Sequence, residues 1–343
     1  MRVKKTYLFL NLLTFLSCLG ILFSCQKPEP PFDAQSSKRV VKEKKIILPK
    51  DTLIKDIKDS TENVIVLVID GARYCDTWEA AGTLLIPYRT ALRNEGFFCT
   101  NFKNNGLTLT VSGHTAIVTG KYETLTNTGT QTPSYPSFMQ VWRKTFNQPS
   151  EKAWIVASKD KLEVIKNCTN GEWNGVGNPK TNCGISGLGS GYRDDLTTLN
   201  KAKAILTEYE PNLMLINFKQ PDFAGHSADS LAYVQGIFDT DNYVNLIWNF
   251  IQTSEHYKNK TALIVTNDHG RHTPGHLDGY ISHGDDCEGC RHIEFLALGP
   301  DFKKNFISQT SYEQVDIAPT VAYLLGFKMP YGDGKIMKEL LNN

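Results

Sequence analysis

The chain lacks any strong excess of charge. Its 343 residues carry 37 Lys and Arg against 36 Asp and Glu, a formal net charge of +1. That balance gives no support for a polyanionic partner, and we expect no nucleic acid polymer to bind. Residues 61–343 also contain no internal repeat and no low-complexity run. These roughly 280 residues therefore fit one large α/β domain, or one domain with a small insertion.

A long, mostly apolar run occurs at the N-terminus, over residues 7–23, behind a basic segment. This pattern predicts an export signal over residues 1–25, and a retained membrane helix is the alternative. Leu22-Phe23-Ser24-Cys25 resembles a bacterial lipobox, although Phe23 replaces the usual small residue. The resemblance implies cleavage before Cys25 and lipidation of its thiol. We therefore expect an exported bacterial lipoprotein, periplasmic or at the cell surface, anchored at Cys25, with residues 26–60 as a solvated tether.

Cysteine is sparse beyond residue 25. Of the eight cysteines, six remain there: Cys75, Cys99, Cys168, Cys183, Cys287 and Cys290. An even number in an exported protein suggests disulfides, and the nearest pairs are Cys168–Cys183 and Cys287–Cys290. A lone Cys-x-x-Cys is weak evidence for structural zinc, and a redox role usually needs a helix N-terminus. For Cys287 and Cys290, which precede a predicted strand, we expect a small disulfide.

Apolar, strand-like runs alternate with helical patterns along residues 61–343. The predicted strands are 64–69, 153–157, 213–218, 262–265 and 293–298, and the predicted helices are 196–209, 231–253 and 314–325. This alternation predicts an α/β fold with a mainly parallel central sheet flanked by helices on both faces. Residues 167–193 are rich in Gly and Asn, and we expect a small loop-rich cap there that forms a wall of the site.

Acidic and imidazole side chains follow three of the predicted strands. Asp70 ends the first, Asp222 and His226 follow the third, and Asp268 and His269 follow the fourth. Because ligands in open α/β sheets gather at the carboxyl ends of strands, we expect these side chains to form one metal site. Mixed carboxylate and imidazole ligands suit Zn²⁺, although Mn or Fe can occupy the same ligands.

A hydroxyl group is available between the first and second strands. In the segment 106–120, Thr110 stands where a polar loop gives way to helix-compatible residues. The N-terminus of a helix favours an anion, and a neighbouring divalent cation makes a hydroxyl a usable nucleophile. A Thr-rich strand with an ordinary N-cap is the alternative.

Five short motifs that contain these acidic, imidazole and hydroxyl residues follow one another along the chain. They are Val-Ile-Asp-Gly (68–71), Thr-Val-Ser-Gly-His-Thr-Ala-Ile-Val-Thr-Gly (110–120), Pro-Asp-Phe-Ala-Gly-His (221–226), Asn-Asp-His-Gly (267–270) and His-Gly-Asp (283–285). In order and spacing they resemble the alkaline phosphatase superfamily, in the branch that holds type I phosphodiesterases, nucleotide pyrophosphatases and Thr-nucleophile alkaline phosphatases. The resemblance spans nearly all of residues 61–343 and implies an alkaline phosphatase-like fold.

Carried over position by position, the resemblance implies two divalent metal ions, with zinc as the expected metal. One ion would be held by Asp222, His226 and His283, and the other by Asp70, Asp268, His269 and the nucleophile Thr110. We prefer His283 as the third imidazole because Gly284 and Asp285 follow it. His272 and His276 we expect to be loop residues near the mouth of the site.

The segment Ser158-Lys-Asp-Lys161 resembles Ser-any-Lys-Asp-Arg of the Thr-nucleophile monoesterases, which supplies cations to the outer phosphate oxygens. Lys159 matches the family's Lys, and Lys161 replaces its Arg, with loss of bidentate geometry. A solvated charged turn is the alternative. The family also places an Asn beyond the nucleophile helix. Asn127 is the nearest candidate, and its role stays open.

These observations predict a phosphoric ester hydrolase that acts on a small phosphate ester through a phospho-threonine intermediate. Extra cations favour monoesters, whose phosphate carries more charge than that of a diester. A type I phosphodiesterase or nucleotide pyrophosphatase is the nearest alternative, and a non-catalytic metal-binding lipoprotein is a remote one. A sulfatase is disfavoured because the chain has no Cys/Ser-x-Pro-x-Arg run. The natural substrate and the oligomeric state stay open.

Overall fold

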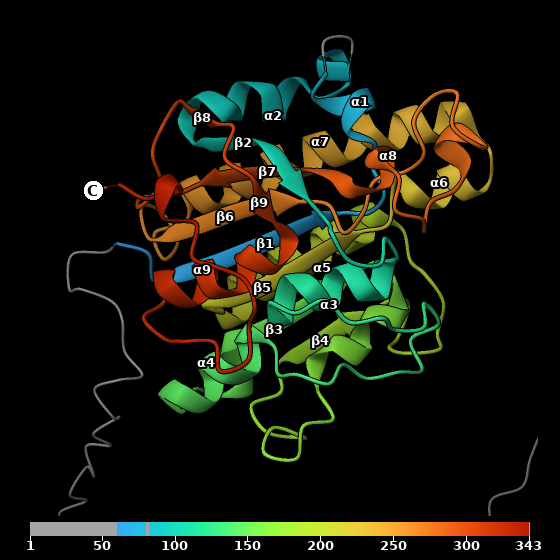
Figure 1. Cartoon of the computed structure of the whole chain (residues 1–343). Helices are drawn as coiled ribbons and strands as arrows, with labels where there is room; N and C mark the ends of the chain where they lie inside the picture. Colours follow the sequence, from blue (N-terminus) through green and yellow to red (C-terminus); the bar gives the residue numbers. More distant parts are fainter. Residues whose placement is uncertain (1–59, 80–81, 343) are drawn as a thin grey trace, which may run out of the picture. The chain divides into compact units, whose positions relative to one another are not determined.

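The fold is built on one nine-stranded sheet, seen in a computed structural model that describes residues 60–79 and 82–342. The strands are β1 (Asn63–Ile69), β2 (Phe97–Lys103), β3 (Ala153–Ala157), β4 (Lys180–Cys183), β5 (Leu213–Phe218), β6 (Thr261–Thr266), β7 (His292–Leu298), β8 (Phe306–Ser308) and β9 (Tyr312–Glu313). Their order is β4-β3-β5-β1-β6-β7-β2-β8, and β9 pairs with β2. Only β7 runs antiparallel to its neighbours, β6 and β2 (Figure 1). The prediction of a mainly parallel sheet is confirmed.

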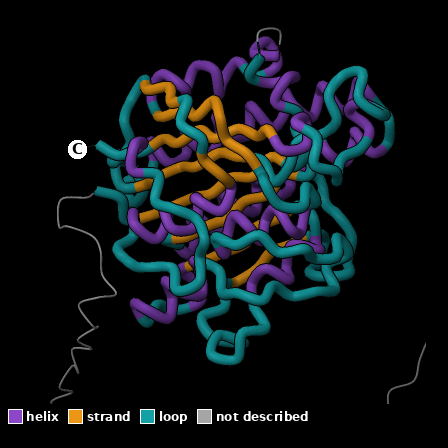
Figure 2. Tube along the Cα trace, in the orientation of Figure 1, coloured by secondary structure: helices purple, strands orange, loops and turns teal. Residues whose placement is uncertain are grey.

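Helices cover both faces of the sheet (Figures 1 and 2). They are α1 (Tyr74–Thr77), α2 (Pro87–Leu92), α3 (Thr110–Thr119), α4 (Phe138–Phe146), α5 (Asp195–Tyr209), α6 (Asp222–His226), α7 (Ser230–Thr253), α8 (Glu288–Arg291) and α9 (Ile317–Leu324). The predicted helices 196–209 and 231–253 correspond to α5 and α7. The third predicted helix is a 3₁₀ turn, Gln314–Asp316, followed by α9.

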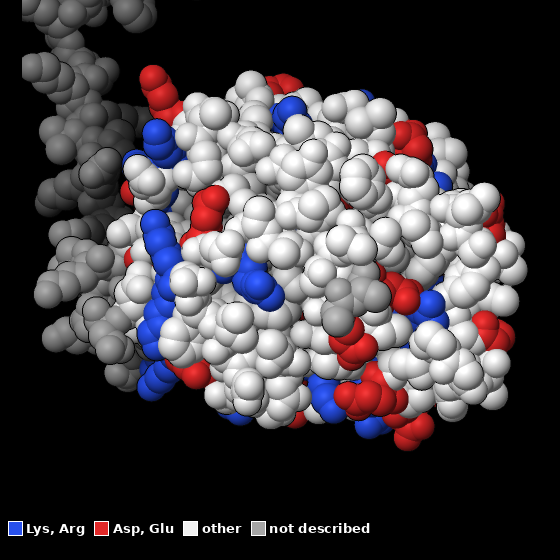
Figure 3. All heavy atoms as spheres, turned by 90° about the horizontal axis from the view of Figure 1, so that it is seen from above, with Lys and Arg blue, Asp and Glu red and all other residues white. Residues whose placement is uncertain are grey.

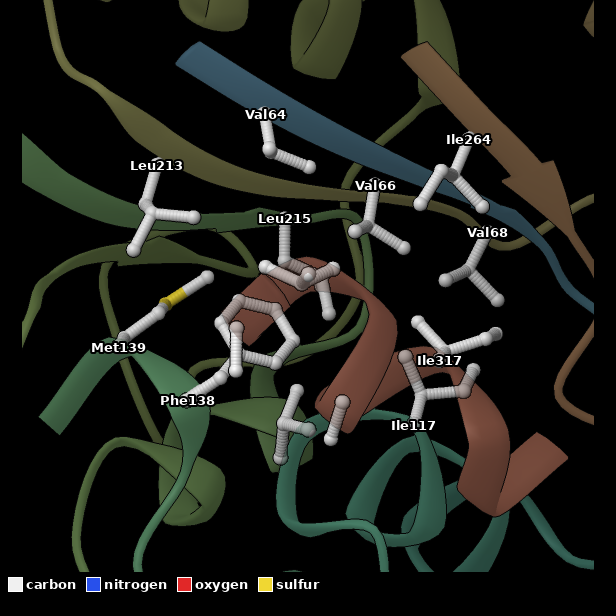
Figure 4. Close-up of a cluster of buried hydrophobic side chains, with 14 of the residues drawn as sticks. Val64, Val66, Val68, Ile117, Phe138, Met139, Leu213, Leu215, Ile264 and Ile317 are labelled. Carbon is white, nitrogen blue, oxygen red and sulfur yellow. The ribbon is translucent and has the colours of Figure 1, made fainter. Parts of the chain in front are cut away.

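The central strand β1 separates two apolar cores. Because side chains alternate along a strand, Val64, Val66 and Val68 face one side and Ile65, Leu67 and Ile69 the other. The valines pack with Ile117 of α3, Phe138 of α4 and Ile317 of α9, as Figure 4 shows. The isoleucines and Leu67 pack with buried residues of α5 and α7. Burial on both faces explains why this strand reads as an unbroken apolar run.

Residues 167–193 differ from the predicted loop-rich cap. Lys180–Cys183 form β4, which extends the sheet by parallel pairing with β3. The rest is irregular, as predicted, and Gly191 lies beside the site, where its N–H donates to Asp160 Oδ2 at 2.9 Å. The four residues of β4 satisfy their backbone groups by pairing at the sheet edge, which the Gly- and Asn-rich composition did not indicate.

The predicted disulfides are not formed. All six cysteines beyond residue 25 are free, including both predicted pairs. Cys287 is the N-cap of α8, and its Sγ accepts a hydrogen bond from Cys290 N–H at 3.4 Å. The expectation that this pair lies away from a helix N-terminus was therefore wrong as well. The predicted signal, the lipidated Cys25 and the tether through residue 59 lie outside the described residues.

The surface agrees with the balanced composition. On the face shown in Figure 3, basic and acidic side chains are interspersed among uncharged ones. Among the described residues, we find no helix with the length and apolar character needed to span a membrane.

A buried ion network ties α2 to the sheet and to α7, and we predict that it contributes strongly to stability. Arg89 is fully buried, and its guanidinium contacts Asp241 Oδ1 at 2.9 Å and Glu294 Oε1 at 2.5 Å. Arg89→Ala would leave two buried carboxylates without their cation, and should lower the free energy of unfolding by about 3–5 kcal/mol. Chemical denaturation measures this. The partly exposed neighbour Arg93→Ala is the control, and an equal loss there would contradict the assignment.

Candidate metal centre and active site

The site forms where three neighbouring strands end. In the sheet, β1 lies between β5 and β6, and all three are parallel. Asp70 follows β1 directly, Asp268 and His269 follow β6 after one residue, and Asp222 follows β5 after a three-residue link. Backbone pairing continues past the strands, since Asp222 N–H donates to Asp70 C=O at 3.1 Å. Strand order thus brings together residues that are up to 199 positions apart in the sequence.

The first ligand group consists of Asp70, Asp268 and His269, all fully buried. His269 Nδ1–H donates to the carbonyl of Gly270 at 2.9 Å, and burial lowers the pKa of this imidazole to about 3. Its Nε2 therefore carries a bare lone pair, which lies 3.4 Å from Asp268 Oδ2 and 3.6 Å from Asp70 Oδ1. Neither His269 Nε2 nor Asp268 Oδ2 has a hydrogen-bond partner. The unpartnered lone pairs of His269 Nε2 and Asp268 Oδ2, which face the Asp70 carboxylate, fit a bound cation.

The second ligand group consists of Asp222, His226 and His283. His283 Nδ1–H donates to Thr108 C=O at 2.7 Å, so its Nε2 faces Asp222 Oδ1 at 3.3 Å and His226 Nε2 at 3.0 Å. His283 also stacks on His269, with ring centroids 3.7 Å apart. Burial lowers the pKa of His226 to about 4, so this imidazole is neutral near pH 7. Two imidazoles and a carboxylate again form a donor set suited to zinc.

Lys159 occupies the space between the two groups. Its Nζ lies 2.7 Å from Asp70 Oδ1, 2.6 Å from Asp222 Oδ2 and 3.2 Å from Thr110 Oγ1. Burial would lower the pKa of Lys159, but the charges of Asp222 and Asp70 outweigh it and raise that pKa. Even so, burial and the charge of Asp268 hold the pKa of Asp70 well above its usual range. Lys159 therefore does not fully balance the charge of Asp70, which a bound divalent cation would stabilise.

Thr110 is the first residue of α3 and is buried. The helix has no side-chain cap at Leu109; instead Val111 N–H, next to Thr110, donates to Asn127 Oδ1 at 3.1 Å. Gly113 allows α3 to lie against the end of β6, because a Cβ there would meet the carbonyl oxygen of Asp268 at 2.4 Å. The Thr-rich segment is thus a helix, and its N-terminus points at the ligand groups.

Lys161 and Tyr192 line the site beside Lys159. The ring of Tyr192 lies 5.8 Å from the Nζ of Lys159 and 5.9 Å from that of Lys161. Burial, together with the charge of Lys159, lowers the pKa of Lys161 to about 8. The segment is therefore not a solvated turn, since both lysines are buried.

Two supporting residues were missed by the sequence analysis. Arg271 is fully buried, and its guanidinium contacts Asp222 Oδ1 and the carbonyls of Tyr280 and Ile281. Asn217, in β5, donates to Asp70 Oδ2 at 3.1 Å and lies 3.2 Å from His114 Nε2. The available signal was modest: Arg271 directly follows the Asn-Asp-His-Gly motif, and Asn217 is a polar residue inside an apolar strand.

The comparison with known proteins settles the family. The sequence model of the family "Type I phosphodiesterase / nucleotide pyrophosphatase" matches residues 64–287, which include every residue of both ligand groups. The chain belongs to this family. It is therefore a phosphoric ester hydrolase of the alkaline phosphatase superfamily, whose members depend on divalent metal ions.

Solved structures show the same fold at low identity. A phosphonate monoester hydrolase from Silicibacter pomeroyi aligns with a TM-score of 0.62 and 12% identity, over 81% of this chain and 76% of that one. Murine ectonucleotide pyrophosphatase/phosphodiesterase 5 aligns with a TM-score of 0.59 and 17% identity, over 82% of this chain and 100% of the murine chain. An inactive variant of the murine protein, with one threonine replaced by alanine, was solved in complex with AMP.

One curated relative is similar over a short stretch. A 2,3-bisphosphoglycerate-independent phosphoglycerate mutase from Ureaplasma urealyticum is 26% identical over 132 residues. The match covers 37% of this chain and only 24% of the mutase.

Proposed function

We propose that this hydrolase acts on small phosphate monoesters, with Thr110 as the nucleophile and two divalent ions, zinc in the first place, as cofactors. The observation that carries the proposal is the convergence of both ligand groups and one hydroxyl on Lys159 Nζ, which lies 2.7 Å from Asp70, 2.6 Å from Asp222 and 3.2 Å from Thr110 Oγ1. Asp268 and His269 contribute unpartnered atoms to the first group, and two imidazoles join Asp222 in the second. The inactive threonine-to-alanine variant of the murine relative supports a threonine nucleophile.

Each ligand group would hold one ion. Asp222, His226 and His283 form one set, and Asp70, Asp268 and His269, completed by Thr110, form the other. When bound, a pair of ions about 4 Å apart lowers the pKa of a coordinated hydroxyl and stabilises charge on the attacking and leaving oxygens. Mn or Fe can use the same ligands.

The chain's own residues bind and orient the phosphate. Thr110 Oγ1 attacks phosphorus, and the bond between phosphorus and the alcohol oxygen breaks, which releases the alcohol. Water then cleaves the phospho-threonine to release phosphate. The dipole of α3, which begins at Thr110, favours the phosphate's negative charge. Asn127 uses its carbonyl oxygen on Val111 N–H, which leaves its NH₂ group free to donate to a phosphate oxygen.

The two lysines argue for a monoester. A monoester carries one more negative charge on its outer oxygens than a diester. Lys159, next to Thr110, and Lys161, which shares the ring of Tyr192 with Lys159, supply two cations. The family match favours the second candidate, phosphodiesterase or nucleotide pyrophosphatase activity. The rates of hydrolysis of 4-nitrophenyl phosphate and of its bis ester, measured on protein of known metal content, distinguish a monoesterase from a diesterase. We expect the monoester to react faster, and a strong preference for the bis ester would defeat the monoester proposal.

Lys161 should give the reaction a distinctive pH dependence. Since its pKa is lowered to about 8, it loses its positive charge above that pH and no longer attracts the phosphate. We therefore expect KM for a monoester to rise above pH 8 in the wild type. Lys161→Arg keeps its charge and should show a flat KM in the same range. Parallel rises in both proteins would show that Lys161 does not bind the phosphate.

A further inference from the structure

A third group of metal-ligating side chains lies outside the two groups already described. His272, His276, Asp285 and Cys287 each offer one ligand atom, and the four atoms all lie within 4.8 Å of one another. Asp285 Oδ2 is 3.2 Å from His272 Nε2 and 3.3 Å from His276 Nε2. The two rings meet edge to face at 83°, so their nitrogen atoms converge on the same carboxylate oxygen. None of the four residues belongs to the catalytic groups.

A carboxylate outside the cluster, that of Asp278, fixes the orientation of the His272 ring. Metal-binding histidines usually have such a partner. His272 is buried, and its Nδ1 lies 2.8 Å from Asp278 Oδ1. Ser282 Oγ–H in turn donates to the same Asp278 oxygen at 2.7 Å. A hydrogen bond to one ring nitrogen fixes the tautomer and presents the other nitrogen to the ion. His272 Nε2 is thereby aimed into the cluster.

The thiol of Cys287 is held at the opposite end of the loop. Cys287 is free, and its place as N-cap of α8 is fixed by the hydrogen bond from Cys290 N–H. The loop between β6 and α8 is held mainly by polar contacts, such as those from Arg271 to the carbonyls of Tyr280 and Ile281, and it buries little apolar surface. Most of residues 273–286 are exposed or half-buried, and Leu277, 76% exposed, adopts a φ of 45°. A loop with so little buried apolar surface gains from a cross-link.

We propose that these four residues bind a third divalent ion, zinc, which holds the loop from Arg271 to Cys287 in place. One thiolate, two imidazoles and one carboxylate are a zinc donor set, and the thiolate disfavours Mg²⁺ and Ca²⁺. Four protein ligands complete a tetrahedron, so the ion is structural and has no open position for a substrate. His283 lies on this loop between His276 and Asp285, and the ion thereby positions a residue of the catalytic centre. The inference does not rest on the proposed function.

Cobalt substitution tests the site without reference to activity. Apoprotein titrated with Co²⁺ should develop a thiolate-to-cobalt charge-transfer band in the near ultraviolet, because Cys287 is the one thiol among the three described groups. Cys287→Ser should abolish the band and lower the metal content by one ion per chain. The matched variant Cys290→Ala should keep both. His276→Ala, a change at an exposed residue, should also lose the band.

Absence of the band in the wild type, or its persistence in Cys287→Ser, would overturn the third site. Either result would mean that His272 and His276 only form hydrogen bonds to Asp285. Neither result depends on whether the protein hydrolyses phosphate esters. Chymotrypsin tests the loop-holding role, because it cleaves after exposed leucines such as Leu277. Zinc-loaded wild-type protein should be cleaved there more slowly than Cys287→Ser, and equal rates would refute this role.

Discussion

Replacing Thr110 with alanine is expected to lower the turnover of a phosphate monoester by on the order of 10⁴-fold or more, with metal content unchanged. The change removes the only atom that can form the phospho-threonine, while the six other ligands stay in place. Thr110 Oγ1 contributes one hydrogen bond to the site, from Lys159 at 3.2 Å, so the fold should tolerate its loss. Steady-state rates and metal analysis on the same preparation measure both effects.

Two variants control for this result. Thr115 lies on the same helix, is fully buried, and its Oγ1 has no hydrogen-bond partner, so Thr115→Val changes a buried threonine without touching the chemistry. It should keep nearly full turnover. Thr110→Ser retains a hydroxyl and should recover part of the rate. Wild-type turnover in Thr110→Ala would refute the covalent mechanism.

Replacing Asp268 with asparagine is expected to have the second largest effect. Asp268 Oδ1 accepts from Gly71 N–H at 3.2 Å and His269 N–H at 3.0 Å, and the asparagine oxygen can keep both bonds. The change therefore removes a charge and an unpartnered oxygen with little change in shape. Loss of one ion should cost about 4 kcal/mol of transition-state stabilisation, or roughly 10³-fold in rate. Metal content should fall by one ion per chain.

Thermal unfolding in a chelator separates this loss from misfolding. In metal-free protein, two effects of Asp268→Asn oppose each other. The change relieves the repulsion by which Asp268, after burial, raises the pKa of Asp70, but it also loses the attraction of His269, His114 and Lys159, which outweighs burial and lowers the pKa of Asp268 itself. We therefore expect the melting temperature in chelator to stay close to that of the wild type although activity falls. Asp316→Asn is the comparison for a buried carboxylate outside the ligand groups. Each Asp316 oxygen accepts one backbone N–H group, so asparagine loses one bond there and should lower the melting temperature without loss of an ion. A lower melting temperature for Asp268→Asn in chelator would point to a structural role instead.

Much of the centre of the fold was predictable because its signals are local. A strand buried on both faces leaves a continuous apolar run, so β1, β5 and β6 were evident, as were the acidic residues at their ends. The periodic patterns of α5 and α7 were equally clear. Mainly parallel pairing then follows from alternation with helices.

The remaining features depend on contacts that are distant in sequence. Strand β2, Phe-Phe-Cys-Thr-Asn-Phe-Lys, has no clear period, and it forms because β7 pairs with it antiparallel from about 190 residues away. Disulfides require two Cβ atoms at a set distance, which sequence proximity cannot supply. Asn217 and Tyr192 reach the site only because β5 and the segment before α5 end beside β1. Their residue types alone carry no signal of that position.

Anomalous diffraction from crystals of the zinc-loaded protein tests the central claim most directly. We expect two strong peaks about 4 Å apart beside Thr110 Oγ1. One should contact Asp222, His226 and His283, and the other Asp70, Asp268 and His269. Fully loaded crystals without a peak between these six side chains would contradict the two-ion centre and the mechanism built on it.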